Sequence, residues 1–398
     1  MVGLLLLGFS SGLPYYLTSD TLQAWLTVEN LDLKTIGFAG LVGLPYTLKF
    51  LWAPFIDRFS VPFLDRRRSW IALTQLFLAV GILGMSFQSP RLGLPLLAGF
   101  AVIVAFLSAT QDIVFDAYRS DVLEEQEVGN GAAIGVFGYR IALLVTSSLA
   151  LILADWLGWP LVYRLLALLM IAGIPVTFWA PRIKKNQPPE SLAEAVILPL
   201  NEFFMRSGLG RGIAIVGFVI LYKFGDYLAS RMATTFLLKI GFSQTEIGIY
   251  KGGLGFAALT LGVLVSTLFL KRLGTNRCLW IFGGLQAISN LAYFTLALVG
   301  KSYPLVVTSI CIENFCAGLG TAAFVAFLIS QCDPRYSATQ YALLSSLMTF
   351  GSTVVASPAG AIAQSSGWPS FFAITTVAAI PGLLLLPVFA PWNAPKTA

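Results

Sequence analysis

The chain has 398 residues, of which 57% are hydrophobic and only 11% are charged. Soluble globular domains carry roughly 25% charged residues, so this composition indicates a protein that uses lipid as its solvent. The net charge of +6 does not indicate nucleic-acid binding, because the basic residues lie between apolar runs and form no stripe or arm. The sequence contains no histidine, which removes most metal sites and acid/base motifs. We expect no enzyme activity, no metal and no cofactor.

Apolar runs that are long enough to cross a bilayer follow one another along the whole chain. A spanning helix needs about 20 mostly apolar residues, and the loops between the runs are too short to hold further domains. The first run lacks a basic segment before it and a cleavage site after it, so we interpret it as a retained helix and not as a signal peptide. We predict twelve spans, near 2–27, 35–56, 69–88, 94–118, 130–154, 160–180, 210–238, 245–270, 277–299, 304–331, 338–364 and 369–390.

A polar break at 181–209 interrupts this series and contains several prolines and lysines. Its later part alternates glutamate with apolar residues at helical spacing, which is typical of a helix on the membrane surface. The break predicts an N-terminal six-helix half over 1–180, a cytoplasmic linker over 181–209 and a C-terminal six-helix half over 210–398. The predicted fold is therefore an all-α membrane protein with twelve helices in two halves.

Weak internal similarity supports the two halves. The second span opens with Lys34-Thr35-Ile36-Gly37 and the eighth with Thr245-Glu246-Ile247-Gly248. The first span carries Tyr16 and Asp20 four residues apart, and the seventh carries Tyr222 and Asp226 at the same spacing. These matches keep one register across the break at 181–209, which favours a repeat of six plus six spans.

Basic residues in short loops predict the orientation, because cytoplasmic loops are enriched in lysine and arginine. With a cytoplasmic N-terminus the outer loops hold only Lys34, Arg91, Lys239 and Lys301, and all other loop and tail bases lie inside. We therefore expect both termini in the cytoplasm of a bacterial cell and the spans in its inner membrane.

The loop after the second span contains Asp57-Arg58 and, a few residues later, Arg66-Arg67-Arg68. This pattern resembles the loop signature of major facilitator transporters, in which an Asp-Arg pair precedes a basic cluster. The resemblance implies a cytoplasmic latch that holds one conformer and opens in the other. Its predicted members are Asp57, Arg58, Arg66 and Asp121. The alternative is that the arginines only anchor the loop on the inner side of the membrane.

Ten charged residues inside predicted spans are candidates for a functional role. Each would cost roughly 2.5–3.5 kcal/mol at the bilayer centre, so ten that faced lipid would cost on the order of 25 kcal/mol. They must therefore face a wet cavity or one another. They are the acids Asp20, Asp112, Asp116, Asp226 and Glu313 and the bases Lys49, Arg140, Lys223, Arg231 and Lys251.

Helical spacing places several of these charges on polar stripes. Ser108, Asp112 and Asp116 share one face of the fourth span, and Lys223 and Asp226 share one face of the seventh. Each acid/base couple has two interpretations, a structural ion pair or a ligand or proton site. Asp116 and Arg119 lie near the predicted cytoplasmic end of their span, which favours a structural ion pair. Lys223 and Asp226 lie near the middle of theirs, and both interpretations stay open for them. The mid-span positions of Arg140 and Glu313 favour a functional role.

Two long strings resemble one particular family. Ser19-Asp20-Thr21-Leu22-Gln23-Ala24-Trp25 is similar to the first hairpin of the AmpG family of bacterial muropeptide permeases, and Thr110-Gln111-Asp112-Ile113-Val114-Phe115-Asp116 to its fourth span. Shorter strings at Gly138-Tyr139-Arg140 and Gly320-Thr321-Ala322 continue the likeness along the chain. The chain differs in having no polar N-terminal tail and in stopping after its twelfth span, where some relatives continue.

This resemblance implies proton-driven import of anhydro-muropeptides for cell-wall recycling and, indirectly, for β-lactamase induction. Such a ligand combines sugars with an acidic peptide, so bases would bind its carboxylates and aromatic rings its sugar faces. The expected partners are this small molecule, protons and the lipid bilayer, with no nucleic acid, and the expected oligomeric state is a monomer. The predicted ligand residues are Tyr16, Trp25, Lys49, Tyr139, Arg140, Tyr222, Lys223, Lys251 and Asn314. The predicted proton carriers are Asp20, Asp112, Asp226 and Glu313.

Two other classes of function stay open on the sequence. One is a permease for another bulky organic anion, such as an acyl-CoA-like compound. The other is a membrane sensor that transports nothing. Competition by muropeptide in uptake assays separates the first from the predicted function, and the absence of any flux in vesicles would favour the second.

Overall fold

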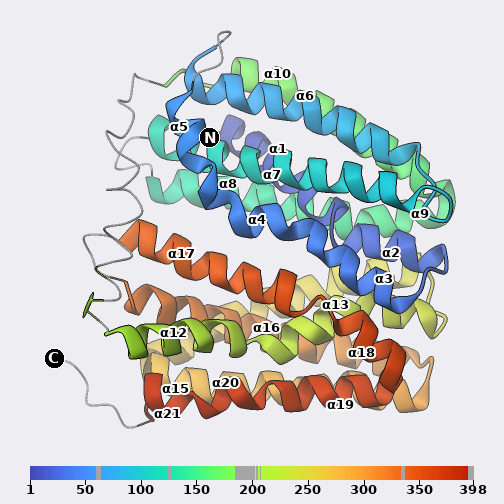
Figure 1. Ribbon diagram of the computed structural model, residues 1–398, viewed down its shortest axis with the longest axis vertical. Helices are drawn as coiled ribbons and strands as arrows, with labels where there is room; N and C mark the ends of the chain where they lie inside the picture. The colour runs from blue at the N-terminus through green and yellow to red at the C-terminus, as the bar shows by residue number, and fades with distance from the viewer. Residues whose placement is uncertain are drawn as a thin grey trace. The chain divides into compact units, whose positions relative to one another are not determined.

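The structure is a computed structural model, and it describes residues 1–59, 64–123, 128–183, 202, 205–206, 208–332 and 337–392 (Figure 1). Within these ranges the chain is built from helices, and nine of them are long and apolar enough to cross a membrane. Most of the linker predicted over 181–209, including its surface helix, lies outside the described residues. The arginine at 335 and the lysine at 396, two of the bases used for the orientation, lie outside them too.

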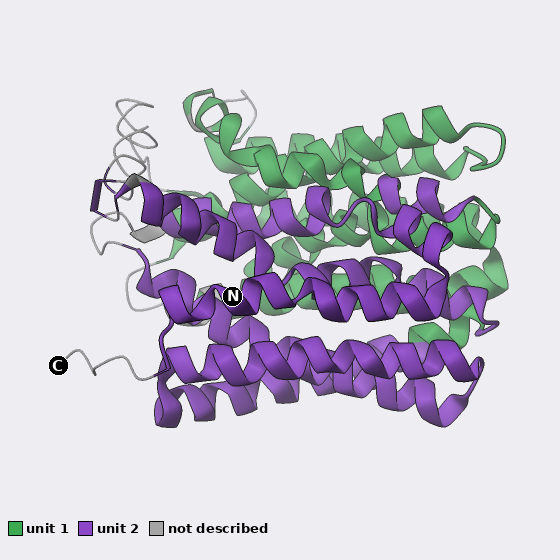
Figure 2. Ribbon diagram, turned by 60° about the horizontal axis from the view of Figure 1, so that its bottom comes forward, with its two compact units in different colours: residues 1–31, 39–190, 243–248 green, residues 32–38, 191–242, 249–398 purple. Residues whose placement is uncertain are grey.

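The chain divides into two compact units, which Figure 2 shows in two colours. Unit 1 holds residues 1–31, 39–190 and 243–248, and unit 2 holds residues 32–38, 191–242 and 249–398. Each unit therefore follows one sequence half closely but contains one short segment from the other half.

The helices of unit 1 lie mostly in the first half of the chain. They are α1 (Val2–Leu17), α2 (Asp20–Val28), η1 (Ala39–Gly43), α4 (Leu44–Leu48), η2 (Lys49–Leu51), α5 (Ala53–Arg58), α6 (Arg66–Ser86), α7 (Leu94–Val122), α8 (Val128–Leu144), η3 (Val145–Leu149), α9 (Ala150–Leu157), α10 (Trp159–Trp179) and α14 (Gln244–Ile249), the last residue of which belongs to unit 2.

The helices of unit 2 lie mostly in the second half. They are α3 (Leu33–Phe38), α12 (Leu209–Leu221), α13 (Phe224–Lys239), η4 (Tyr250–Gly255), α15 (Phe256–Val299), α16 (Tyr303–Ser330), α17 (Ser337–Phe350), η5 (Gly351–Val355), α18 (Ala359–Ser366), α19 (Trp368–Ala378), α20 (Ile380–Leu384) and α21 (Leu386–Phe389).

Several predicted spans are interrupted or joined. The first span is two helices, α1 and α2, separated at Thr18–Ser19, and the seventh is α12 and α13, separated at Tyr222–Lys223. The second span changes repeatedly between α-helix and the tighter 3₁₀ form. The eighth span begins with α14 and η4 and continues into α15, and α15 is two helices that meet at a sharp turn at Gly274, where φ is +79°. This left-handed conformation strongly favours glycine, because other residues would bring their Cβ into collision with the backbone.

Inside unit 1, α6 packs between α7 and α10, and α1 packs along α8 (Figure 1). A buried network of side-chain hydrogen bonds joins four of these helices. Ser10 Oγ on α1 accepts hydrogen bonds from Gln75 Nε2 on α6 (2.9 Å) and Gln111 Nε2 on α7 (3.3 Å). Thr177 Oγ1 on α10 donates to Gln75 Oε1 at 2.8 Å. Side-chain hydrogen bonds between helices stabilise membrane bundles because lipid offers the same groups no partner.

Inside unit 2, α15 and α16 form the closest helix pair. Their backbones approach where small residues face each other, because a Cβ at Gly262 would meet Phe315 O and one at Gly318 would meet Leu259 O. Close approach at glycines is the usual way in which membrane helices gain van der Waals contact. Beside this pair, the rings of Phe218, Tyr222 and Phe324 pack into an aromatic core. The α15–α16 pair carries Gln286, Asn290, Glu313 and Thr321, and α13 carries the polar residues that face α16.

Candidate functional site

Unit 1 places two other predicted site residues, Lys49 and Tyr139, around Asp112 on α7. Ser11 Oγ on α1 donates a 2.5 Å hydrogen bond to Asp112 Oδ1. A cavity of about 250 Å³ is lined by Asp112, Tyr139 and Asp116, together with Ser11 and Arg119. Lys49 lies near enough for its charge to act on Asp112, and Arg140 and Asp20 act on Tyr16 in the same way. The first half of the chain therefore brings its acids, bases and tyrosines together as one polar cluster.

The break in the first span gives Asp20 its setting. Asp20 is the first residue of α2, and the chain before it leaves the helix at Thr18–Ser19. A helix N-terminus carries a partial positive charge from its unpaired backbone N–H groups. A carboxylate is the kind of group that this position stabilises.

The same arrangement recurs in unit 2. Asp226 lies in the first turn of α13, directly after the break at Tyr222–Lys223, and it is buried. Lys223 follows the C-terminal end of α12, where the helix dipole favours a cation. Discontinuous helices with charges at their ends are typical of binding sites in secondary transporters.

The polar cluster of unit 2 is built around Lys223, Asp226 and Glu313. Lys223 Nζ lies 3.7 Å from Asp226 Oδ2 and donates a 2.7 Å hydrogen bond to Thr321 Oγ1 on α16. Glu313 on α16 accepts hydrogen bonds from Ser230 Oγ (3.3 Å) and from Asn314 Nδ2 (2.9 Å).

Lys251 and Arg231, the other two bases predicted within spans of this half, also have partners in unit 2. Lys251 Nζ donates to Thr234 Oγ1 at 2.7 Å, and Arg231 donates to Ser352 O. Lys223 and Asp226, which helical spacing placed on one face, therefore pair with each other, and Glu313 binds Ser230 of the same helix and its own neighbour Asn314. Thr321, Gln286 and Asn290 belong to the same region and were not among the predicted site residues.

Two predicted ligand residues lie in hydrophobic cores instead. Trp25 is 1% exposed, and its ring packs against Trp159 and Tyr163 in unit 1. Tyr222 donates its hydroxyl to Leu279 O at 2.8 Å and stacks on Phe324 in unit 2. An aromatic residue in an apolar run has no sequence signal that tells which face of its helix it occupies, so the pattern could not separate these two rings from those beside the charges.

One predicted member of the latch, Asp121, forms an ion pair within unit 1. Its Oδ2 lies 3.1 Å from Nε of Arg67, the residue next to the predicted member Arg66. The next arginine, Arg68, pairs with Asp65 and donates to Ala180 O at the end of α10. Arg58 is exposed, and the side chain of the predicted member at position 57 lies outside the described residues. Consecutive residues of a helix point in different directions, so the direction of each arginine side chain decides which acid it reaches. The order of residues in the sequence does not give that direction.

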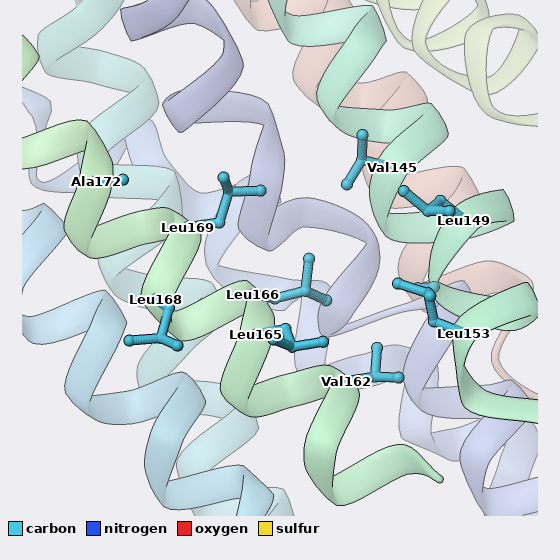
Figure 3. A pocket seen from close by; sticks show the side chains of 10 residues that line it. Val145, Leu149, Leu153, Val162, Leu165, Leu166, Leu168, Leu169 and Ala172 are labelled. Atoms are coloured by element: carbon cyan, nitrogen blue, oxygen red, sulfur yellow. The ribbon is translucent and has the colours of Figure 1, made fainter. Parts of the chain in front are cut away.

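Unit 1 also has a larger cavity, of about 350 Å³, between the segment from η3 to α9 and helix α10 (Figure 3). Leu149, Leu153 and Leu165 point toward it in the close view, and its lining is valine, leucine and alanine throughout. Its side chains offer no hydrogen-bonding or charged group, so this cavity does not suit a charged, hydroxyl-rich solute.

Comparisons with known proteins agree with this geometry. The profile of the Major Facilitator Superfamily matches residues 4–356. The chain is 47% identical over 386 residues to the anhydromuropeptide permease of Escherichia coli (strain K12), which covers 96% of this chain and 78% of that protein. It is 32% identical over 394 residues to the putative transporter AmpG 4 of Rickettsia conorii, covering 96% and 94%.

Solved structures show the same fold at low sequence identity. The nucleoside transporter NupG has a TM-score of 0.70 at 15% identity, covering 98% of this chain and 99% of that one. The xylose transporter XylE of E. coli, in an inward open conformation, has a TM-score of 0.72 at 13% identity, covering 100% and 97%. These neighbours and the relatives above are transporters and not enzymes. They confirm the predicted helical membrane fold. The chain is thus a membrane transporter that belongs to the Major Facilitator Superfamily and, within it, to the AmpG family.

Proposed function

We propose that this transporter imports anhydromuropeptides across the bacterial inner membrane into the cytoplasm. The observation that carries the proposal is the 47% identity to the E. coli anhydromuropeptide permease, which extends over 96% of the chain. The imported compound feeds cell-wall recycling and, through it, β-lactamase induction. The protein acts as a monomer with both termini in the cytoplasm.

Uptake is driven by protons in this proposal. Carboxylates are the available carriers because the chain has no histidine, and two of them lie within polar clusters. Asp112 has Ser11 as a hydrogen-bond donor and lines a cavity. Glu313 has Ser230 and Asn314 as donors. We assign the proton to one or both of these acids, with Asp20 and Asp226 at helix N-termini as the next candidates.

The ligand is held by the bases and aromatic rings of the same clusters. Lys49, Arg140, Lys223 and Lys251 are the cations available for the peptide carboxylates, since charge-assisted hydrogen bonds are the strong ones. Tyr16, Tyr139 and Asn314 accompany them and suit sugar hydroxyls and ring faces. Trp25 and Tyr222 support the site through the cores in which they lie.

The experiment is uptake of labelled anhydromuropeptide into proteoliposomes with an imposed proton gradient. We expect accumulation that depends on an inward gradient and stops with a protonophore. Glu313→Gln and Asp112→Asn should each reduce uphill accumulation. If the substituted acid carries the proton, its variant should still exchange labelled for unlabelled ligand.

Two results would change this assignment. Uptake that an acyl-CoA-like anion inhibits, and that unlabelled muropeptide does not, would assign the protein to another bulky anion. Full uphill uptake in the variant with Asp20, Asp112, Asp226 and Glu313 all neutralised would show that the acids are structural.

A further inference from the structure

Three polar side chains in unit 2 are buried with atoms that have no hydrogen-bond partner among the described residues. Asn290 on α15 is fully buried, and both its amide nitrogen and its amide oxygen lack a partner. Gln286 Nε2, one turn earlier on α15, and Asp226 Oδ1 on α13 also lack one. Buried polar groups in proteins are almost always satisfied by protein or by ordered water, so this group of atoms indicates a bound polar ligand.

Contacts along α16 place Gln286 at the level of Thr321. The side chain of Gln286 lies against Gly320, because a Cβ at that glycine would collide with Gln286 Oε1. The neighbouring residue Thr321 accepts the hydrogen bond from Lys223 Nζ. One side of the group is therefore defined by Gln286, Thr321 and Lys223, which come from three different helices.

The other side of the group is defined about two turns earlier on α16. There Ser230 of α13 donates to Glu313. Asp226 lies between Lys223 and Ser230 on α13, at helical spacings of three and four, so it faces α16 between these two levels. Asn290 follows Gln286 by four residues and lies on the same face of α15.

Cys316 connects the two helices at this intermediate level. Its thiol lies near the side chain of Ser289, the neighbour of Asn290, and it is close enough to Asp226 for the charge of that carboxylate to act on it. Tyr293, one turn beyond Asn290, is also within electrostatic reach of Asp226. The unpartnered atoms of Asp226, Asn290 and Gln286 therefore come from elements that meet around Cys316.

The chemistry of the unpartnered atoms identifies the ligand. Asn290 Nδ2 and Gln286 Nε2 are donors, whereas Asn290 Oδ1 and Asp226 Oδ1 are acceptors. A cation would satisfy only the acceptors and an anion only the donors. Water both donates and accepts, and a buried water typically makes about three hydrogen bonds to such groups.

We propose that α13, α15 and α16 hold a site for ordered water between Asp226, Asn290 and Gln286. The inference deepens the proposed function, since it rests on Asp226 being one of the acids that respond to protons. Asn290 and Gln286 are positioning residues here, because they hold the water that keeps the Asp226 carboxylate hydrated inside a membrane span. Without it, Asp226 Oδ1 would face only protein that offers it no donor.

Hydroxyl-radical labelling in ¹⁸O water tests the site without substrate or proton gradient. Radicals generated from internal water modify the nearest reactive side chains, and Cys316 and Tyr293 lie beside the proposed site although both are buried. Cys278 is a matched control, because it is fully buried in the hydrophobic core of the same unit. We expect rapid ¹⁸O incorporation at Cys316 and Tyr293 and none above background at Cys278.

Asn290→Leu replaces the amide with an apolar side chain of similar volume, and labelling at Cys316 should fall several-fold. Gln286→Leu is the second variant if Asn290→Leu fails to fold. Equal labelling of Cys316 and Cys278 in the wild-type protein, or unchanged labelling of Cys316 in the folded variant, would overturn the water site. Because the readout needs no transport, it stands or fails separately from muropeptide uptake.

Discussion

Lys223 holds two partners at once, with its Nζ 2.7 Å from Thr321 Oγ1 and 3.7 Å from Asp226 Oδ2. Both charges are buried, and Lys223 lies in the break between α12 and α13, directly before the first turn of α13, which holds Asp226. The acid occupies the N-terminal turn of α13 and the base follows the C-terminus of α12, and these are the helix ends that stabilise a negative and a positive charge respectively. This arrangement explains how an ion pair persists within a membrane span.

Substitution of this pair separates a structural role from a binding role. Lys223→Ala should weaken binding of acidic muropeptide by roughly 1–3 kcal/mol, because a charge-assisted hydrogen bond is lost. The same variant should affect a sugar ligand without peptide carboxylates much less. Binding and uptake of the two ligands in proteoliposomes provide the measurement.

The double variant Lys223→Ala with Asp226→Ala is the control for this prediction. Removing one member of a buried ion pair typically costs about 3–5 kcal/mol because the other charge stays uncompensated. The double variant should therefore regain thermal stability but not the uptake of acidic ligand. Recovered uptake would remove Lys223 from the ligand site and leave it only as the partner of Asp226.

The Arg67–Asp121 pair should contribute to the stability of the end of unit 1 at which α6 begins and α7 ends. Their side chains are only 9% and 12% exposed, so Arg67→Ala leaves a poorly solvated carboxylate and should lower the melting temperature. Asp116→Ala is the matched control, since its carboxylate is 57% exposed in its pair with Arg119 and such pairs contribute about 0–1 kcal/mol. Melting curves in detergent compare the two, and equal shifts would contradict the prediction.

Exchanging the charges of the pair tests whether its sign matters. Arg67→Asp combined with Asp121→Arg should recover part of the lost stability, whereas either single reversal should be worse than alanine. If transport rates change while melting temperatures do not, the pair acts on conformational exchange, as the latch interpretation predicts.

Gly318 should tolerate no side chain where α15 and α16 meet. A Cβ there would collide with Leu259 O, and overpacking of this kind costs about 1–3 kcal/mol. Gly284→Ala on α15 is the control, because a Cβ at that position meets no atom within 4 Å, and alanine is favoured over glycine in a helix by about 0.5–1 kcal/mol. Thermal unfolding should show opposite shifts for the two alanine variants. A stable Gly318→Ala protein would mean that the helix pair can separate without cost.

The start of α3 should depend on pH through Asp32. Its carboxylate accepts hydrogen bonds from Thr35 N (2.9 Å) and Thr35 Oγ1 (2.7 Å), and these bonds lower the pKa of Asp32 below its usual range. A carboxyl group with a lowered folded-state pKa contributes stability above its unfolded-state pKa, and this contribution disappears as the pH falls through the folded-state value. The difference in melting temperature between the wild type and Asp32→Asn should therefore be complete near neutral pH and shrink in acid. A difference that does not vary with pH would show that Asp32 does not cap α3 as an anion.

The fold could largely be predicted from the sequence because crossing a bilayer is a local requirement. Twenty apolar residues in a row indicate a span wherever they occur, so all twelve predicted ranges contain helix in the described part of the chain. Charges inside those spans marked Asp112, Lys223 and Glu313 for the same reason, since the cost of burying a charge is large for any packing.

What only the tertiary structure decided is which side chains meet. The pairing of Arg67 with Asp121, the core positions of Trp25 and Tyr222, and the burial of the Asn290 amide all depend on how helices turn against one another. Gln286 and Asn290 recur at helical spacing, which was a signal, but an amide costs much less than a charge in an apolar run. Hydropathy is summed over neighbouring residues, so the membrane spans can be predicted from the sequence. Hydrogen bonds and ring contacts form between segments that are far apart in the chain, so they become known only once the helices are packed.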